Sequence, residues 1–93
     1  MEDRFIVGPV LLCGSISDAI VEAIRIENPN VIVIDRGAYV RVAVAGRCRV
    51  SRAMIESRLG REFRIPRDLE AVMTSFEGRL SMSGDEAVWS ARD

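Results

Sequence analysis

The most regular hydrophobic pattern in the chain is a pair of apolar stretches joined by a short polar turn, at about residues 31–44. Residues 31–34 are an unbroken β-branched run, which is typical of a central strand covered on both faces. Residues 35–37 interrupt this run, and Gly37 can adopt the positive φ of a tight turn. The sequence therefore predicts a β-hairpin here, with the rest of the chain arranged around it.

The second strand of this hairpin has one apolar face and one mixed face. Side chains alternate between the two sides of a strand, and the two sets are Val40, Val42 and Val44 against Tyr39, Arg41 and Ala43. The valine face needs helices packed against it. For Tyr39 and Arg41 two interpretations stay open: they cover a second structural layer, or they face a partner protein, because Tyr and Arg are enriched at interfaces.

Three helices are predicted from apolar spacing and from capping and stop residues, at about 17–27, 52–59 and 67–76. Ser15 or Ser17 is the expected cap of the first helix, and Ser51 that of the second. The strongest helical spacing, at i, i+3, i+4 and i+7, belongs to the third helix and consists of Leu69, Val72, Met73 and Phe76. Apolar stripes of this kind indicate helices that pack on a sheet.

Further strands are predicted on both sides of these helices. Residues 5–13 are extended and apolar, and Pro9 within them indicates an edge strand or a bulge. A short strand follows at 47–50, and a second hairpin is expected at about 79–90, with Leu80, Met82, Val88 and Trp89 as its apolar contacts. This order of elements predicts an α+β fold with mainly antiparallel pairing.

Length and charge limit the classes of protein that the chain can represent. Its 93 residues predict a single domain, residues 1–93, with loose ends at 1–4 and 91–93. A net charge of -1 argues against nucleic acid as a partner, since phosphate binding needs a basic surplus. No apolar run approaches the length of a membrane span, so we expect a cytoplasmic protein that does not bind membranes.

The sequence contains few of the residues that usually form catalytic or metal-binding sites. The chain contains no His, the commonest general base and metal ligand. Its two cysteines, Cys13 and Cys48, are too few and too far apart for a metal site, and we expect both to be buried apolar residues. Carboxylates such as Glu27 and Glu70 are expected to be solvated on helix surfaces. These features favour a binding or regulatory role over an enzyme, and a small α+β ligand-sensing or protein-interaction domain is an alternative.

Six short motifs, in this order, resemble the MmoB/DmpM family, the effector proteins of bacterial multicomponent diiron monooxygenases. They are Val7-Gly8-Pro9, Glu27-Asn28-Pro29, the stretch from Asp35 to Arg41, Gly46, Leu59-Gly60-Arg61-Glu62-Phe63 and Ser75-Phe76-Glu77-Gly78. The similarity covers roughly residues 6–90 and is nearest to the effectors of toluene and alkene monooxygenases. The chain departs from some members of the family in having only a few residues before Val7.

The resemblance implies a cofactor-free, non-catalytic protein that binds the diiron hydroxylase of an aromatic or alkene monooxygenase. Such a protein is expected to reshape the active site of the hydroxylase and to couple electron transfer to O2 activation, hydroxylation or epoxidation. A ferredoxin or reductase can compete with it for the hydroxylase surface. The residues expected to bind the partner are Val7, Gly8, Pro9, Asn28, Arg36, Tyr39, Arg41 and Arg61.

Overall fold

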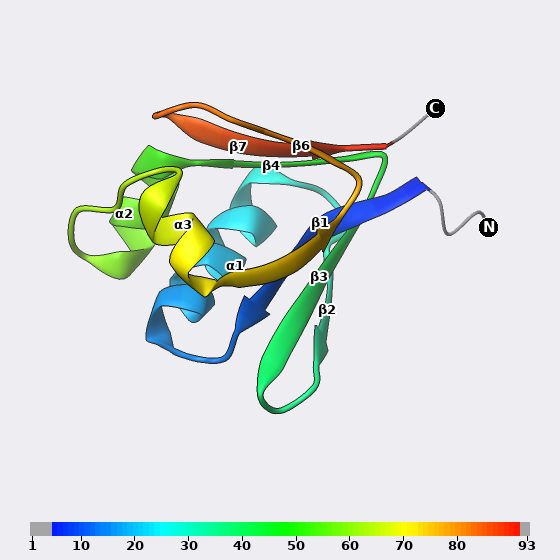
Figure 1. Ribbon diagram of the computed structural model, residues 1–93, viewed down its shortest axis with the longest axis horizontal. Helices are drawn as coiled ribbons and strands as arrows, with labels where there is room; N and C mark the ends of the chain where they lie inside the picture. Colours follow the sequence, from blue (N-terminus) through cyan, green and yellow to red (C-terminus); the bar gives the residue numbers. More distant parts are fainter. Residues whose placement is uncertain (1–4, 92–93) are drawn as a thin grey trace.

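Two antiparallel sheets and three helices make up the fold in the computed structural model, which describes residues 5–91 (Figure 1). The predicted α+β class is confirmed. In chain order the elements are β1 (Ile6–Leu12), α1 (Ser15–Glu27), β2 (Ile32–Asp35), β3 (Tyr39–Ala45), β4 (Arg47–Ser51), α2 (Arg52–Leu59), α3 (Arg67–Val72), β5 (Met73–Glu77), β6 (Arg79–Met82) and β7 (Glu86–Ser90).

The predicted hairpin at 31–44 is confirmed, but its first strand is not central. Strands β2 and β3 pair antiparallel, and Gly37 in the turn has the expected positive φ of 87°. The first sheet has the order β2-β3-β1-β5, so β2 lies at its edge. Ile32 is accordingly 58% exposed. An apolar run reveals the tendency to form a strand but not which strand becomes its neighbour, and β1 and β3 take the inner positions.

Strand β1 is an inner strand despite Pro9, so the predicted edge position is wrong. The alternative prediction, a bulge, is confirmed one residue further on, because the pairing with β5 shifts register between Val10 and Leu11. Gly8 allows β1 and β3 to approach closely, since a Cβ atom there would lie 2.3 Å from the carbonyl oxygen of Val42. The glycine at this position is therefore required by the sheet itself.

The third helix, predicted at 67–76, is confirmed only for its first part. Helix α3 is only six residues long, and Met73–Glu77 form strand β5. Met73 still contacts the core, whereas Phe76 is 37% exposed and takes no part in a helical stripe.

At the start of α3, the backbone N–H of Arg64 donates to the Asp68 carboxylate over 2.8 Å, and this bond lowers the pKa of Asp68.

The second sheet has the order β4-β7-β6 and contains the predicted C-terminal hairpin. Trp89 is fully buried and Leu80 and Met82 pack against the core, as predicted. Val88 neighbours Trp89 in the strand and so points to the opposite, less buried side. The predicted strand at 47–50 is β4, and its partner is β7.

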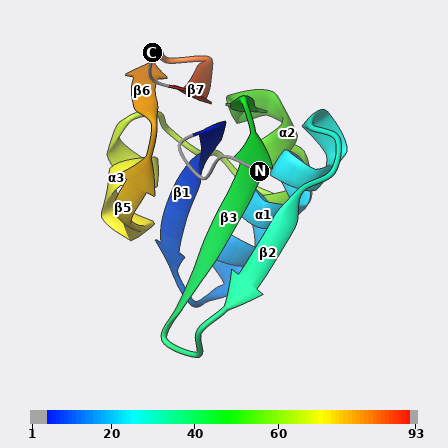
Figure 2. The ribbon, with the colours of Figure 1, turned by 90° about the vertical axis from the view of Figure 1, so that its right-hand side faces the viewer.

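The predicted positions of helices α1 and α2 are confirmed, but the predicted side-chain cap of α1 is not found. Helix α1 begins at Ser15 after Gly14, no side chain caps it, and Ser17 is buried instead. Helix α2 is capped as predicted, with the Met54 N–H donating to Ser51 Oγ over 3.1 Å. In Figure 2 helices α1 and α2 lie behind the first sheet. The buried core contains side chains of both this sheet and α1: Val7, Leu11, Ile20, Ile24, Val42 and Val44.

A polar clamp, formed by Glu27 and Asn28, ties the end of α1 to β4. The Asn28 side chain accepts the N–H of Arg49 at 2.9 Å and donates to the carbonyl of Arg49 at 2.7 Å. Glu27 accepts both the N–H and the hydroxyl of Ser51 at 2.7 Å, so its predicted solvation is wrong. The carboxylate lies where β4 passes into α2, and it orders that junction.

The remaining predictions concern the cysteines, the ends and the membrane. Cys48 is buried, but Cys13 is exposed, so only one of the two predicted buried thiols is found, and both are free. Of the predicted loose ends, residues 1–4 and 92–93 lie outside the described part of the chain. Ala91 is held in place, because its backbone N–H donates to the Gly46 carbonyl over 2.9 Å. No helix within residues 5–91 is long and apolar enough to cross a membrane.

Candidate protein-docking face

One face of the first sheet packs against the helices, and the other is open (Figure 2). Two shallow hollows lie on it, and we call the surface that they form the open sheet face. Its residues come from the turn and from strands β1, β2, β3 and β5: Ile6, Val10, Ile32, Ile34, Arg36, Tyr39, Arg41, Ala43, Thr74, Ser75 and Glu77.

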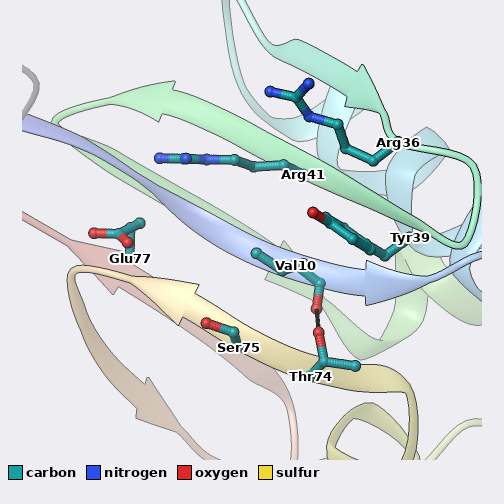
Figure 3. A pocket seen from close by; sticks show the side chains of 7 residues that line it. All are labelled: Val10, Arg36, Tyr39, Arg41, Thr74, Ser75 and Glu77. Atoms are coloured by element: carbon teal, nitrogen blue, oxygen red, sulfur yellow. Dashed lines mark hydrogen bonds between the residues drawn. The ribbon is translucent and has the colours of Figure 1, made fainter.

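The first hollow has a volume of about 490 Å³ and lies between the β2–β3 hairpin and β5. Figure 3 shows Arg36, Tyr39 and Arg41 along one side of it, with Ser75 and Glu77 along the other. The floor is strand β1, whose bulge is bridged by a hydrogen bond of 3.4 Å from the Thr74 hydroxyl to the Val10 carbonyl.

The second hollow, about 330 Å³, is mainly apolar. Ile6, Ile32, Ile34 and Ala43 line it together with Arg41, which also lines the first hollow. Cross-strand pairing explains this shared position, because Arg41 in β3 lies between Ile34 in β2 and Val10 in β1. The open sheet face thus combines an apolar zone with a cationic and aromatic zone.

The two arginines of this face are available to a partner. Within residues 5–91 neither Arg36 nor Arg41 forms a salt bridge, and Tyr39 is 43% exposed. The interpretation that Tyr39 and Arg41 cover a second layer is therefore wrong for the described part of the chain. Guanidinium groups in this situation suit bidentate contacts with carboxylates.

Three of the eight predicted partner-binding residues lie together on the open sheet face: Arg36, Tyr39 and Arg41. Val7, Gly8 and Pro9 are buried within β1, and Asn28 belongs to the clamp on β4. Arg61 is exposed but lines a separate hollow between α1 and α2. These five residues do not contribute to the same surface.

Sequence reasoning missed the contribution of β5 to this surface. Ser75 falls within the helix that the sequence predicts at 67–76, and Glu77 directly follows it. Their place beside β1 depends on strand pairing, with Gly8 opposite Glu77 and Val10 opposite Ser75. The spacing of neighbouring residues carries no signal for that pairing.

The side chains that commonly bind metal ions are spread apart in the described part of the chain. Between residues 5 and 91 no three His, Cys, Asp or Glu side chains lie close enough together to hold a metal ion. With its open sheet face, the chain has the features of a small α+β binding domain. The chain belongs to the MmoB/DmpM family, whose model matches residues 6–90.

A relative and two solved structures support this assignment. The chain is 45% identical over 89 residues to the effector subunit of an alkene monooxygenase system from Xanthobacter autotrophicus (strain ATCC BAA-1158 / Py2), covering 94% of this chain and 87% of the relative. Its fold matches a chain of a phenol hydroxylase–regulatory protein complex, with a TM-score of 0.83, 21% identity and coverage of 94% and 99%.

The second structure is soluble methane monooxygenase regulatory protein B, with a TM-score of 0.73 and 26% identity. The match covers 99% of this chain and 68% of that protein. These proteins carry the names of effector or regulatory components and not of catalytic ones. The resemblance inferred from the six motifs is thereby confirmed.

Proposed function

We propose that this chain is the effector of a multicomponent diiron monooxygenase acting on alkenes or aromatic hydrocarbons. It binds the hydroxylase component and is not itself a catalyst. The observation that carries the proposal is the 45% identity, across 94% of the chain, to an alkene monooxygenase effector subunit. The hydroxylase carries the diiron centre, and this chain works without a cofactor of its own.

The effector acts through differential affinity for two states of its partner. A protein that binds one conformation of the hydroxylase better than another shifts the population toward the first. The same coupling free energy links effector binding to substrate binding at the active site. We propose that the favoured conformation reshapes the substrate pocket and couples the arrival of electrons to O2 activation.

The open sheet face is the surface through which we expect this docking to occur. It offers Tyr39 as a partly exposed aromatic anchor and the guanidinium groups of Arg36 and Arg41 for carboxylates. The first hollow is open to solvent along the sheet (Figure 3). Such a shape suits a protein surface better than a small ligand, which is normally enclosed in a pocket.

The test is a titration of the chain into a mixture of its hydroxylase, ferredoxin and reductase. We expect substrate turnover, and the fraction of reducing equivalents that appear in product, to rise up to stoichiometric effector. An excess is expected to inhibit, because effector and ferredoxin compete for overlapping surface. Activity that stays flat from zero to several equivalents of effector would contradict the proposed function, and heat-denatured chain serves as the control.

A further inference from the structure

A small hollow, separate from the open sheet face, lies where β1 passes into α1. Its volume is about 240 Å³, and residues 12–17 line it together with Val72 at the end of α3. No charged side chain of residues 5–91 lines it, and Leu12, Ile16 and Val72 give it an apolar wall. Because pockets for drug-sized ligands have volumes of roughly 300–1,000 Å³, this hollow suits a small, uncharged molecule.

The hollow also offers hydrogen-bond donors that have no acceptor. Ser17 lines it and is 1% exposed, and its Oγ has no hydrogen-bond partner within residues 5–91. Buried hydroxyl groups are normally hydrogen-bonded, so an unpartnered one marks a place that an acceptor atom of a ligand can complete. No side chain caps α1, and the N–H groups that precede Asp18 in its first turn also lack partners in the described part of the chain.

A nucleophile lies beside these donors. Cys13 is exposed, its thiol is free, and it lines the same hollow, whereas Cys48 is buried. The backbone N–H of Cys13 donates to the Ala38 carbonyl over 3.0 Å, which holds the residue at the end of β1. A thiol, an apolar wall and unpartnered donors therefore meet in one hollow, a combination suited to a small apolar electrophile that carries an acceptor oxygen.

We propose that Cys13 is a site of covalent modification by small apolar epoxides. The choice of electrophile rests on the proposed function, because transfer of an oxygen atom to an alkene yields an epoxide. The hollow has no charged lining that would favour a charged electrophile over this neutral one.

The reaction is a ring opening that needs no oxidant or reductant. The Cys13 sulfur attacks a ring carbon, and the C–S bond forms while the C–O bond breaks. The electron pair of the broken bond moves to the oxygen, where the Ser17 hydroxyl stabilises the developing charge by donating a hydrogen bond. The oxygen then takes up the proton that the thiol loses, and the product is a β-hydroxy thioether.

Mass spectrometry of the full chain treated with 1,2-epoxybutane tests the proposal, with glycidol as a polar epoxide of similar size. Peptide mapping should place the adduct on Cys13, and Cys48 in the same native molecule should stay unmodified. We expect Cys13 to react at least about tenfold faster in the folded chain than in urea, at the same pH. The folded chain, unlike the unfolded one, should also prefer 1,2-epoxybutane over glycidol.

Ser17→Ala tests the proposed donor. Because the hydroxyl has no partner, its removal should leave stability unchanged or raise it, while modification of Cys13 slows toward the rate in urea. Ser81→Ala, at an exposed position of β6, is the matched control and should keep the native rate. Should Ser17→Ala fail to fold, the comparison of the two epoxides decides.

Three results would overturn the proposal: a folded Cys13 that reacts no faster than in urea, equal preference for the two epoxides in both states, or a folded Ser17→Ala variant with the native rate. The experiment uses the isolated chain and added epoxide. Its failure therefore leaves the effector function standing, and a failed turnover titration with the hydroxylase does not change the reactivity measured for Cys13.

Discussion

At the scale of single residues, two glycines in hairpin turns have different backbone requirements. Gly37 has a φ of 87°, and Gly84 is not among the glycines with positive φ. At both positions an added Cβ would meet no atom within 4 Å, so crowding does not distinguish them. The difference between them is backbone strain alone.

We therefore predict that Gly37→Val lowers the free energy of unfolding by about 1 kcal/mol or more, because a β-branched residue resists positive φ. Gly84→Val, the control, should change it much less. Denaturant unfolding of both variants measures the difference. Equal midpoints for Gly37→Val and the wild type would show that the turn relaxes without cost.

The two thiols should differ in reactivity by as much as they differ in burial. Cys48 is completely buried, and burial raises its pKa to about 12. Cys13 is exposed. Because the thiolate is the reactive form, an Ellman titration at about pH 8 should detect one fast thiol in the native chain and a second only after unfolding. Cys13→Ser should remove the fast phase, and two fast thiols in the native protein would contradict the buried position of Cys48.

At the scale of elements, the polar clamp formed by Glu27 and Asn28 connects the end of α1 to β4. Asn28→Ala leaves the Arg49 N–H and carbonyl without their partner, so we predict a loss of about 1–3 kcal/mol in the free energy of unfolding. Glu22→Ala, on the exposed side of the same helix, should be nearly neutral. Chemical denaturation checks both, and an unchanged stability of Asn28→Ala would mean that water replaces the amide.

The elements that the sequence predicted well are those whose signals are local. The two hairpins, α2 with its Ser51 cap, and the end of α1 at Asn28 depend on turn residues and caps within a few positions. Strand β5 could not be predicted in this way. Met73 and Phe76 match helical spacing, but β5 forms because β1, far away in the chain, offers it an edge.

The residues of the candidate site also differ in whether local sequence signals could predict their place. Arg36, Tyr39 and Arg41 could be grouped from the sequence because one hairpin holds all three. Ser75 and Glu77 could not, since they reach the first hollow only through the pairing of β5 with β1. Glu27 was misjudged for a related reason, because its hydrogen-bond donors come from Ser51, on a different element.

At the scale of the whole molecule, the open sheet face and the helices lie on opposite sides of one sheet (Figure 2). Substitutions on the open face should therefore affect binding more than folding. If the proposed function holds, we predict that Arg36→Glu, or Tyr39→Ala with Arg41→Ala, weakens hydroxylase binding by at least about 1.4 kcal/mol, or tenfold. Melting temperatures should change little.

Arg25→Glu is the matched control for Arg36→Glu, because it makes the same change in charge at an exposed residue that lines neither hollow. Affinity and melting are measured on the same samples. A stable Arg36→Glu protein with native affinity would exclude Arg36 from the interface. An equal loss for Arg25→Glu would indicate a general charge effect instead of a defined contact.

The interleaving of the two sheets has a consequence for how the protein is made. Strand β1 is synthesised first, but its neighbour β5 begins only at Met73, after β4 of the other sheet has already appeared. At about 5–20 residues per second, several seconds separate the two strands on the ribosome. During that time β1 has an unpaired side, and β4 still lacks β7. The first sheet has all its strands only at Glu77 and the second only at Ser90, so most of the chain must be made before either sheet can close, and the nascent chain is expected to fold late.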